Sequence, residues 1–139
     1  MIETEIRDKK VLIMDDSIVR GNTSKEIVKM LRDFGAKEVC FASACPPVQN
    51  PCFYGVDMPT KEELIAGNMT ENEIEEFLDV DALLYQKIED LVEAVTRKGN
   101  HHIDSPCMAC LDGNYVTNDI DENKVAEIET MRVNDRNGN

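Results

Sequence analysis

One stretch of the chain decides its fold: Val11-Leu12-Ile13-Met14-Asp15-Asp16-Ser17-Ile18-Val19-Arg20-Gly21-Asn22-Thr23-Ser24. Four apolar residues lead into Asp15 and Asp16, so a buried strand carries both acids to its carboxyl end, where open α/β sheets bind their ligands. Gly21 permits a tight turn, and Thr23 and Glu26 have the spacing of a capping box that opens a helix. Because backbone N–H groups at a helix start attract anions, the stretch predicts a sugar-phosphate site.

The residues that follow complete a strand-helix-strand unit. A helix is expected from about Thr23 to Phe34, with one apolar stripe made of Ile27, Met30, Leu31 and Phe34. Gly35 stands where a left-handed residue ends a helix, and a short buried strand is expected from Val39 to Ala44. Strands joined by a helix are parallel and have a right-handed crossover, so the chain is expected to be α/β with a parallel sheet.

Two capping boxes predict short acidic surface helices further along. The first begins at Thr60 with Glu63 and runs through Ala66 to an end at Gly67, whereas the second begins at Thr70 with Glu73 and runs to about Leu78. Before them, the prolines of Cys45 to Pro59 predict an irregular loop.

The second half of the chain predicts one more strand and two more helical pieces. The strand is expected at Ala82 to Tyr85, followed by a helix that stops at Gly99 and carries the apolar residues Ile88, Leu91, Val92 and Val95. Residues 100–139 are polar, and their helix-like piece from Glu122 to Met131 is expected to be a solvated tail. We therefore divide the chain into residues 1–99 and a C-terminal segment of residues 100–139.

Composition limits the possible functions. With 139 residues, 42% of them hydrophobic, the chain can bury the core of one domain. A net charge of -13 argues against nucleic acid or an anionic membrane as a partner, because both attract clustered Lys and Arg. The absence of an apolar leader or membrane-length segment predicts a cytoplasmic protein, in which the five cysteines are free, catalytic or metal-bound.

Several motifs resemble one enzyme family. The segment Val11 to Ser24 resembles the phosphoribosyl-pyrophosphate (PRPP) motif of type I phosphoribosyltransferases, in the wording typical of amidophosphoribosyltransferases. Three further segments resemble later motifs of that family and follow in the same order: Pro51 to Thr60, Glu63 to Ala66 and Cys107-Met108-Ala109-Cys110. The resemblance runs from about Lys10 to Tyr115. It implies the C-terminal portion of a type I phosphoribosyltransferase fold, a parallel sheet with flanking helices, plus a helical and irregular C-terminal segment.

The resemblance also implies a binding site. In the family, acids resembling Asp15 and Asp16 hold the ribose hydroxyls of PRPP and help to place Mg²⁺, and a loop resembling residues 17–24 cradles the 5'-phosphate. Ionised carboxylates accept hydrogen bonds from vicinal hydroxyls well. Asn22 departs from the Thr that is usual in the family, and no residue is assigned as catalytic. The implied PRPP ligands are Asp15, Asp16, Ser17, Arg20, Gly21, Asn22, Thr23 and Ser24, with Asp15 and Asp16 also as magnesium ligands.

The cysteines resemble part of a cluster site. Cys52, Cys107 and Cys110 resemble three of the four ligands of the [4Fe-4S] cluster in iron-sulfur members of the family, whose fourth ligand lies upstream of the PRPP motif. That fourth ligand is missing here. Cys45 or Cys40 could replace it, although a cysteine within a strand is more often core packing. A zinc site that uses His101 or His102 is an alternative for the Cys-x-x-Cys pair.

The implied function is the first step of de novo purine synthesis, in which PRPP, glutamine and water give 5-phosphoribosylamine, glutamate and pyrophosphate. The family's glutaminase domain and pyrophosphate loop do not fit into the ten residues before Val11. We therefore expect a piece of a longer homo-oligomeric enzyme, inactive alone, whose partners are PRPP, purine nucleotides and an upstream-half polypeptide. Two other hypotheses stay open, namely a non-catalytic PRPP- or nucleotide-binding module and a small iron-sulfur or zinc protein.

Overall fold

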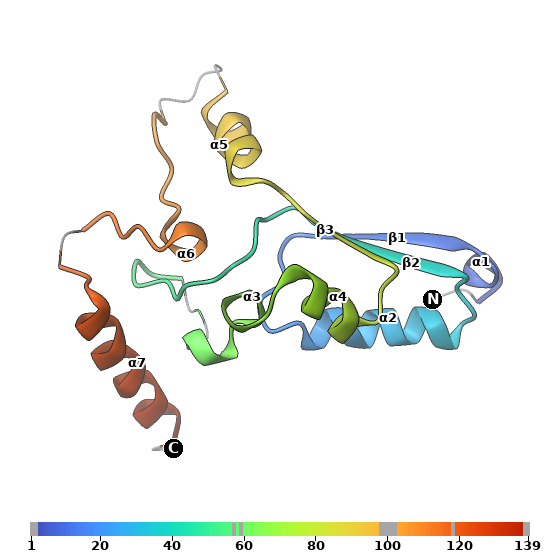
Figure 1. The fold of residues 1–139 in the computed structure, drawn as a ribbon, viewed down its shortest axis with the longest axis horizontal. Helices are drawn as coiled ribbons and strands as arrows, with labels where there is room; N and C mark the ends of the chain where they lie inside the picture. Colours follow the sequence, from blue (N-terminus) through green and yellow to red (C-terminus); the bar gives the residue numbers. More distant parts are fainter. Residues whose placement is uncertain (1–2, 57, 59, 98–102, 118, 138–139) are drawn as a thin grey trace.

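A computed structural model describes residues 3–56, 58, 60–97, 103–117 and 119–137. Figure 1 shows its elements in chain order. The three strands are β1 (Lys10–Asp15), β2 (Glu38–Ser43) and β3 (Ala82–Tyr85), and η1 (Lys61–Glu63) is a 3-10 helix. The α-helices are α1 (Glu3–Ile6), α2 (Asn22–Asp33), α3 (Ile65–Asn68), α4 (Glu71–Leu78), α5 (Ile88–Thr96), α6 (Ala109–Asp112) and α7 (Glu122–Asn137).

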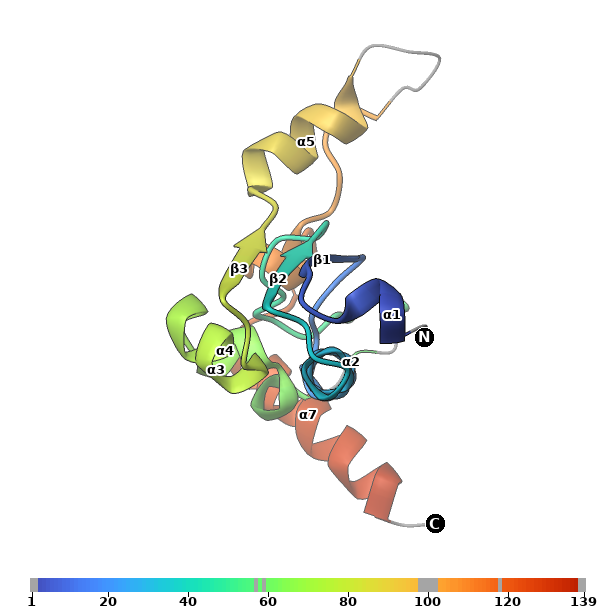
Figure 2. The same cartoon turned by 90° about the vertical axis from the view of Figure 1, so that its right-hand side faces the viewer.

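The three strands form one parallel sheet in the order β1-β2-β3, as the strand-helix-strand pattern predicted. The register pairs Asp15 with Ser43 and Ser43 with Tyr85, so all three strands end at one edge. Helices α2, α3 and α4 lie on the same side of the sheet in Figures 1 and 2. The predicted α/β class is therefore confirmed.

The main core lies between the sheet and these helices. Val39 and Phe41 point into it from β2 and are fully buried, whereas Val11 and Ile13 contribute from β1. Side chains alternate along a strand, so the neighbouring residues of β1 point to the other side. The helices complete this core with Val28, Leu31, Ile65, Ala66, Ile74 and Leu78.

Helix α2 differs in two respects from the sequence prediction. Its buried face is centred on Val28 and Leu31, with Ile27 and Phe34 partly buried, while the predicted core residue Met30 is 41% exposed. The i, i+3, i+4 spacing included Met30 in the apolar stripe, but in the structure Met30 lies at its margin and Val28 lies on the buried side. The predicted left-handed Gly35 is confirmed, with φ 82°.

The segment between the two predicted capping boxes also differs. It divides into η1 and α3, because Leu64 between them has extended backbone angles. Gly67 therefore lies inside α3 and does not end the first helix. Both boxes are present, but α3 and α4 are not simply surface helices, since each contributes two or more of the buried core residues.

A second, smaller core forms around Val48, Met58, Leu64 and Leu111. It joins the irregular loop after β2 to α6, an element that the sequence pattern did not predict. The backbone N–H groups of Gln49 and Asn50 both donate to the Cys110 carbonyl oxygen, each at 3.0 Å. These two hydrogen bonds hold the loop against the start of the C-terminal segment.

Helix α7 is longer than the predicted tail. It extends to Asn137 and does not gather its apolar residues on one face. Its contacts with the body include a hydrogen bond from Arg132 Nη2 to the Cys52 carbonyl oxygen at 2.8 Å. None of the described helices is both long enough and apolar enough to cross a membrane.

The approach to β3 gives a stability prediction. Asp81 accepts hydrogen bonds from the Val39 backbone N–H at 2.7 Å and from Arg32 Nη2 at 2.9 Å. The Val39 N–H, and then Arg32, hold the pKa of the Asp81 carboxyl below its usual range. This stabilisation is complete above the unfolded pKa of about 3.9 and is lost as pH falls through the lower folded pKa.

We expect Asp81→Asn to lower the free energy of unfolding by about 1 kcal/mol at neutral pH, because the charge-assisted hydrogen bonds weaken. Urea unfolding from neutral to acid pH should show that the difference between variant and wild type shrinks in acid. Asp33→Asn, at an exposed carboxylate of α2, is the matched control and should leave stability unchanged. A constant difference at every pH would contradict the assignment to the ionised carboxylate.

Candidate functional site

Two acids mark the carboxyl end of β1. Asp15 is half-buried in the last position of the strand, and Asp16 is exposed just after it. The backbone N–H of Asp16 donates to Asp15 Oδ1 at 2.9 Å, and the Ser17 hydroxyl lies 3.4 Å from Asp16 Oδ1. The acids therefore lie at the sheet edge where open α/β folds bind ligands, as predicted.

Helix α2 begins beside these acids without a side-chain cap. It starts at Asn22, with Gly21 as the N-cap residue in the left-handed conformation at φ 77°, and this residue makes no side-chain cap. The predicted capping box of Thr23 and Glu26 is therefore wrong. The left-handed turn at Gly21 starts the helix before Thr23, which then lies inside the first turn. The uncapped N–H groups of this turn have no intrahelical acceptor and can bind an anion.

A cavity of about 430 Å³ brings the acids and this helix start together. Every PRPP ligand that the resemblance implied lies in its wall, and Val19 is the one additional residue. Ser24 is buried, whereas Asn22 and Thr23 are exposed at the mouth of the turn. The lining residues are Asp15, Asp16, Ser17, Val19, Arg20, Gly21, Asn22, Thr23 and Ser24.

Arg20 does not point freely into this cavity. Its Nη2 lies 2.8 Å from Glu63 Oε1, and its Nε donates to the same oxygen at 3.0 Å. The other oxygen of Glu63 accepts from the Thr60 backbone N–H at 3.0 Å. Arg20 therefore links the loop to Glu63, the last residue of η1, as well as lining the cavity.

Two apolar contacts explain why position 21 is glycine. A Cβ atom at Gly21 would lie 2.8 Å from Ile65 Cδ1 and 3.2 Å from Phe77 Cε1. The loop is fixed further by Ile18, which is 1% exposed, and by the hydrogen bond from the Ile65 N–H to the Val19 carbonyl oxygen at 2.9 Å. Sequence reasoning assigned Gly21 to a turn and missed Ile65 and Phe77, because packing across separate helices leaves no local pattern.

Four of the five cysteines lie in one region of the molecule. Cys45, Cys52 and Cys110 pack against the second core. Burial raises the pKa of the Cys110 thiol, and the neighbouring Cys45, Cys52 and Cys107 raise it further. Cys40 lies elsewhere, on β2 beside Glu38, and burial and then Glu38 and Asp81 raise the pKa of its thiol. Of the two replacement candidates, Cys45 is therefore the one near the other thiols.

These thiols do not form a ready metal site. Among the described residues, no group of three or more His, Cys, Asp or Glu side chains could hold a metal ion. Cys107 is exposed, whereas Cys52 and Cys110 are half-buried. The alternative ligands His101 and His102 lie outside the described residues.

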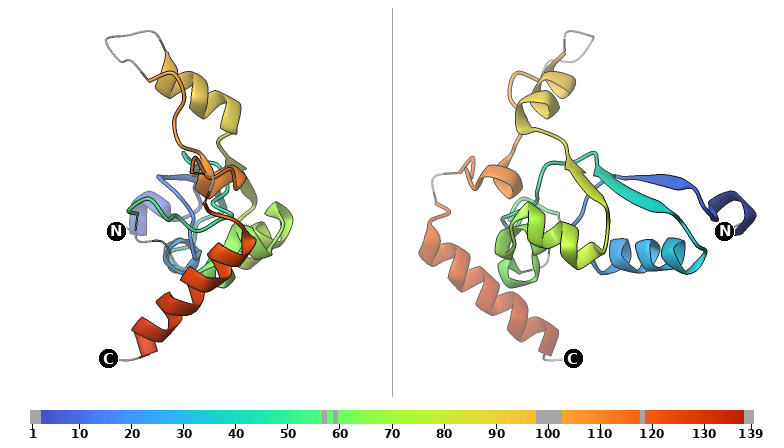
Figure 3. Two further views of the ribbon diagram at one scale, coloured as in Figure 1. Left: turned by 90° about the vertical axis from the view of Figure 1, so that its left-hand side faces the viewer. Right: turned by 45° about the vertical axis from the view of Figure 1, so that its right-hand side comes forward.

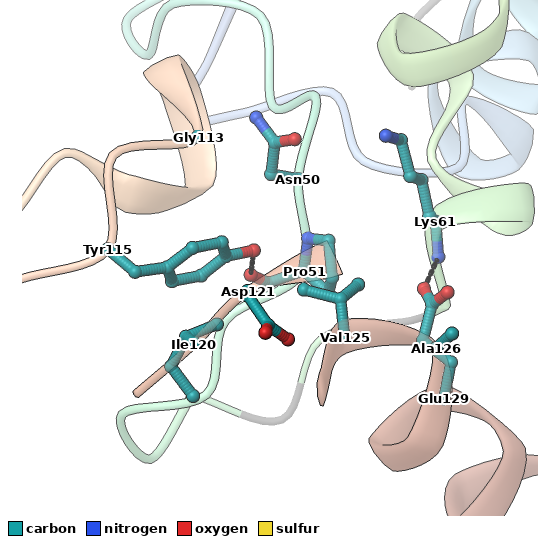
Figure 4. Close-up of a pocket in the computed structure, with 10 residues that line it drawn as sticks. All are labelled: Asn50, Pro51, Lys61, Gly113, Tyr115, Ile120, Asp121, Val125, Ala126 and Glu129. Carbon is teal, nitrogen blue, oxygen red and sulfur yellow. Dashed lines mark hydrogen bonds between the residues drawn. The ribbon is translucent and has the colours of Figure 1, made fainter. Parts of the chain in front are cut away.

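A second cavity of about 630 Å³ lies between the loop at Pro51 and the start of α7, as Figure 4 shows. The Tyr115 hydroxyl donates to the Pro51 carbonyl oxygen at 2.9 Å, and the Lys61 backbone N–H donates to Glu129 Oε1 at 2.5 Å. Its wall combines acidic, basic, amide and apolar groups and shares no residue with the cavity at Asp15. Sequence analysis did not predict it, because it forms between distant segments.

A parallel sheet whose first strand ends in two acids, followed by an uncapped helix start after a glycine turn, is an arrangement that open α/β folds use to bind phosphate-bearing ligands. No family model matches the chain. The chain does match curated relatives named amidophosphoribosyltransferase. Those of Pseudomonas aeruginosa and Escherichia coli are 46% and 44% identical, each over 94% of this chain and 26% of its own length. The relative from Methanocaldococcus jannaschii is 47% identical over 84% of this chain and 23% of its own length.

Solved structures of similar fold point to the same family. One described as the allosteric regulatory enzyme of purine biosynthesis matches 92% of this chain with a TM-score of 0.77 and 38% identity. The glutamine PRPP amidotransferase from B. subtilis, complexed with ADP and GMP, matches 89% with a TM-score of 0.74 and 38% identity. This chain covers 28% of each of those chains. The chain belongs to the amidophosphoribosyltransferase family and spans about a quarter of the length of the relatives that it matches.

The packing at Gly21 gives the second prediction. We expect Gly21→Ala to destabilise the chain by about 2–4 kcal/mol, because it combines a left-handed backbone with overpacking against Ile65. Gly113→Ala is the matched control, since Gly113 has the same φ of 77° but its Cβ would lie 3.4 Å from the nearest atom, Asn50 Nδ2. Urea unfolding of both variants measures the difference. Equal losses would show that only the backbone angle matters at Gly21.

Proposed function

We propose that this chain holds the 5'-phosphate and ribose of PRPP and contributes this site to amidophosphoribosyltransferase, the reaction that forms 5-phosphoribosylamine in purine synthesis. The observation that carries the proposal is the cavity that joins the uncapped start of α2 to Asp15 and Asp16. Membership of the family supports the choice of substrate.

The helix start is suited to the phosphate. The backbone N–H groups of Asn22, Thr23 and Ser24 belong to the first turn of α2, where the helix dipole also favours negative charge. The hydroxyl groups of Ser17, Thr23 and Ser24 belong to the same cavity wall and are further possible donors. The N-cap residue is a glycine, so it has no side chain that competes for these N–H groups.

The acids are suited to the ribose. Asp15 and Asp16 follow β1 and line the same cavity as the helix start, so a sugar attached to the bound phosphate lies within reach of their carboxylates. Carboxylates accept strongly from vicinal hydroxyls. Their negative charge also favours the positive charge that gathers on the anomeric carbon as pyrophosphate leaves.

Magnesium fits the same two acids. Mg²⁺ binds oxygen ligands and commonly uses one or two carboxylates together with substrate phosphates. In this proposal Asp15 and Asp16 hold the ion, which offsets the charge of the pyrophosphate group. Purine nucleotides, which share a ribose 5-phosphate with PRPP, are the second class of ligand proposed for the site.

The proposal keeps the division of the chain into two parts that the sequence predicted. Residues 1–99 form the part of the phosphoribosyltransferase domain with the PRPP site, and residues 100–139 form a separate C-terminal segment. The proposed reaction belongs to the cytoplasm.

The acids and the helix start can be tested separately. We expect the double variant Asp15→Asn with Asp16→Asn to bind ribose 5-phosphate about 10- to 100-fold more weakly, the range for loss of hydrogen bonds to charged groups. Inorganic phosphate should bind the variant as well as or better than the wild type, because two like charges are removed. Isothermal titration calorimetry with Mg²⁺ measures both ligands.

Asp33→Asn is the control, because Asp33 is an exposed carboxylate in the last position of α2, at the opposite end of the helix from the cavity. It should bind both ligands like the wild type. If the wild type binds neither ligand, or if the double variant loses both equally, the assignment of phosphate to the helix and ribose to the acids is wrong.

The [4Fe-4S] cluster stays a prediction from the family resemblance, because the described thiols form no ready metal group. We propose no step that passes through it. If the chain binds a cluster, Cys45 is the candidate for the fourth thiolate, since it lies with Cys52 and Cys110 on the second core. Four thiolates are the normal ligand set of such clusters.

Iron and acid-labile sulfide in anaerobically purified protein test this prediction. If a cluster assembles on Cys52, Cys107 and Cys110 with Cys45 as the fourth ligand, both elements are expected in the wild type, with loss in Cys45→Ser and Cys110→Ser and no loss in Cys40→Ser. Cys40→Ser is the matched control because Cys40 lies on β2 beside Glu38, away from the other thiols. A wild-type chain that is stable without iron would remove the cluster from the proposal.

A further inference from the structure

The cavity between the loop at Pro51 and α7 contains groups that the proposed PRPP site does not use. Its volume of about 630 Å³ lies within the range of small-molecule sites, about 300–1,000 Å³. Segments that are distant in sequence enclose it, namely the loop after β2, the start of η1, the residues after α6 and the first turns of α7 (Figures 3 and 4). Packed segments normally leave few large voids between them. A cavity of this size is therefore a candidate for a second ligand.

The side of the cavity formed by α7 carries two carboxylates. Asp121 Oδ1 accepts from the Lys124 backbone N–H at 2.8 Å, which caps the start of the helix. Glu129 Oε1 accepts from the Lys61 backbone N–H at 2.5 Å. Within the described part of the chain, no hydrogen bond or ion pair reaches the second oxygen of either carboxylate. Each group is thus held in place through one oxygen and can accept from a cationic ligand with the other.

The other side of the cavity offers donors. In Figure 4 the Asn50 amide and the Lys61 ammonium group lie toward one side, and the Asp121 carboxylate lies toward the other. Neither the Asn50 side chain nor the Lys61 ammonium group has a hydrogen-bond partner among the residues that the structure describes. Ammonium and amide N–H groups donate well to a carboxylate. The cavity therefore has an end for a cation and an end for an anion.

Apolar surface lies between the two ends. The Tyr115 ring is fixed because its hydroxyl donates to the Pro51 carbonyl oxygen at 2.9 Å and because Phe53 packs against it, with ring centroids 5.1 Å apart. Burial, and then Glu129, raise the pKa of Tyr115 to about 12, so the hydroxyl keeps the proton that it donates. Val125 adds an aliphatic side chain from α7. This wall suits a short hydrocarbon chain.

We propose that this cavity binds a small molecule with an amine or guanidinium group at one end and a carboxylate at the other, as in a basic α-amino acid. Asp121 and Glu129 accept from the cationic end. Asn50 and Lys61 donate to the carboxylate. The wall contains two carboxylates and one ammonium group, so a ligand of net positive charge complements it and a phosphate-bearing ligand does not. The proposal is independent of the PRPP site, because the two cavities share no residue.

Three ligands of similar shape test the two ends separately. L-Arginine carries both charged groups, L-citrulline has a neutral ureido group in place of the guanidinium, and agmatine lacks the carboxylate. We expect isothermal titration calorimetry of the full chain to show one site for L-arginine. L-Citrulline and agmatine should each bind about 10- to 100-fold more weakly, the range for loss of a hydrogen bond to a charged group.

Two variants assign each end to its residues. Asp121→Asn keeps a side-chain oxygen that caps α7, so the helix start is retained. It should weaken L-arginine and agmatine about 10-fold and leave L-citrulline unchanged, because only the first two carry the cation. Lys61→Gln keeps the backbone N–H that Glu129 accepts. It should weaken L-arginine and L-citrulline about 10-fold and leave agmatine unchanged.

Glu127→Gln is the matched control. Glu127 is an exposed carboxylate of the same helix that pairs with Lys124 and does not line the cavity. The variant should bind all three ligands within about threefold of the wild type, because exposed ion pairs contribute little. Circular dichroism of each variant shows whether the fold is kept.

Three results would overturn the proposal. The first is a wild-type chain that does not bind L-arginine at millimolar concentration. The second is a loss in Asp121→Asn or Lys61→Gln that is equal for all three ligands. The third is a loss in Glu127→Gln as large as that in Asp121→Asn, which would show general attraction of cations to an acidic chain. Inorganic phosphate should bind every variant like the wild type, so failure of the PRPP site is recognised separately.

Discussion

The site depends on the absence of a side chain at Gly21. The left-handed backbone at this residue turns the chain from the acid loop into α2, and the missing Cβ lets Ile65 and Phe77 lie against the turn. Three segments that are distant in sequence therefore meet at one small residue. The position of the first turn of α2, and of the N–H groups that point from it, follows from contacts made by α3 and α4.

The charge of the chain and the proposed charge of its ligand have the same sign. The excess of acidic residues gives a net charge of -13, yet the proposed ligand carries a phosphate. A helix start acts over the length of its first turn, whereas exposed charges are screened by salt over about 8 Å. In the proposed site local geometry therefore outweighs net charge, because the first turn of α2 lines the cavity while Arg20 is paired with Glu63.

The sequence predicted those features that depend on short-range patterns. Apolar runs placed all three strands, and the parallel βαβ unit followed from their connection through α2. The capping box at Thr23 was wrong because the glycine before it begins the helix earlier. Features that depend on distant contacts were missed, including the packing of Ile65 and Phe77 at Gly21 and the short helices α1 and α6. Cys45 could not be chosen over Cys40 until the fold placed one near Cys110 and the other beside Glu38.

The carboxylate of Glu75 occupies one hydrogen-bond donor on the outer edge of β3. A sheet with two free edges can accept a strand at each end, and copies can then add without limit, as in fibres. Here the Leu83 N–H already has its acceptor in Glu75, so a strand that approached the outer edge of β3 would find this donor occupied. A single side chain on a neighbouring helix thus works against edge-to-edge growth at β3.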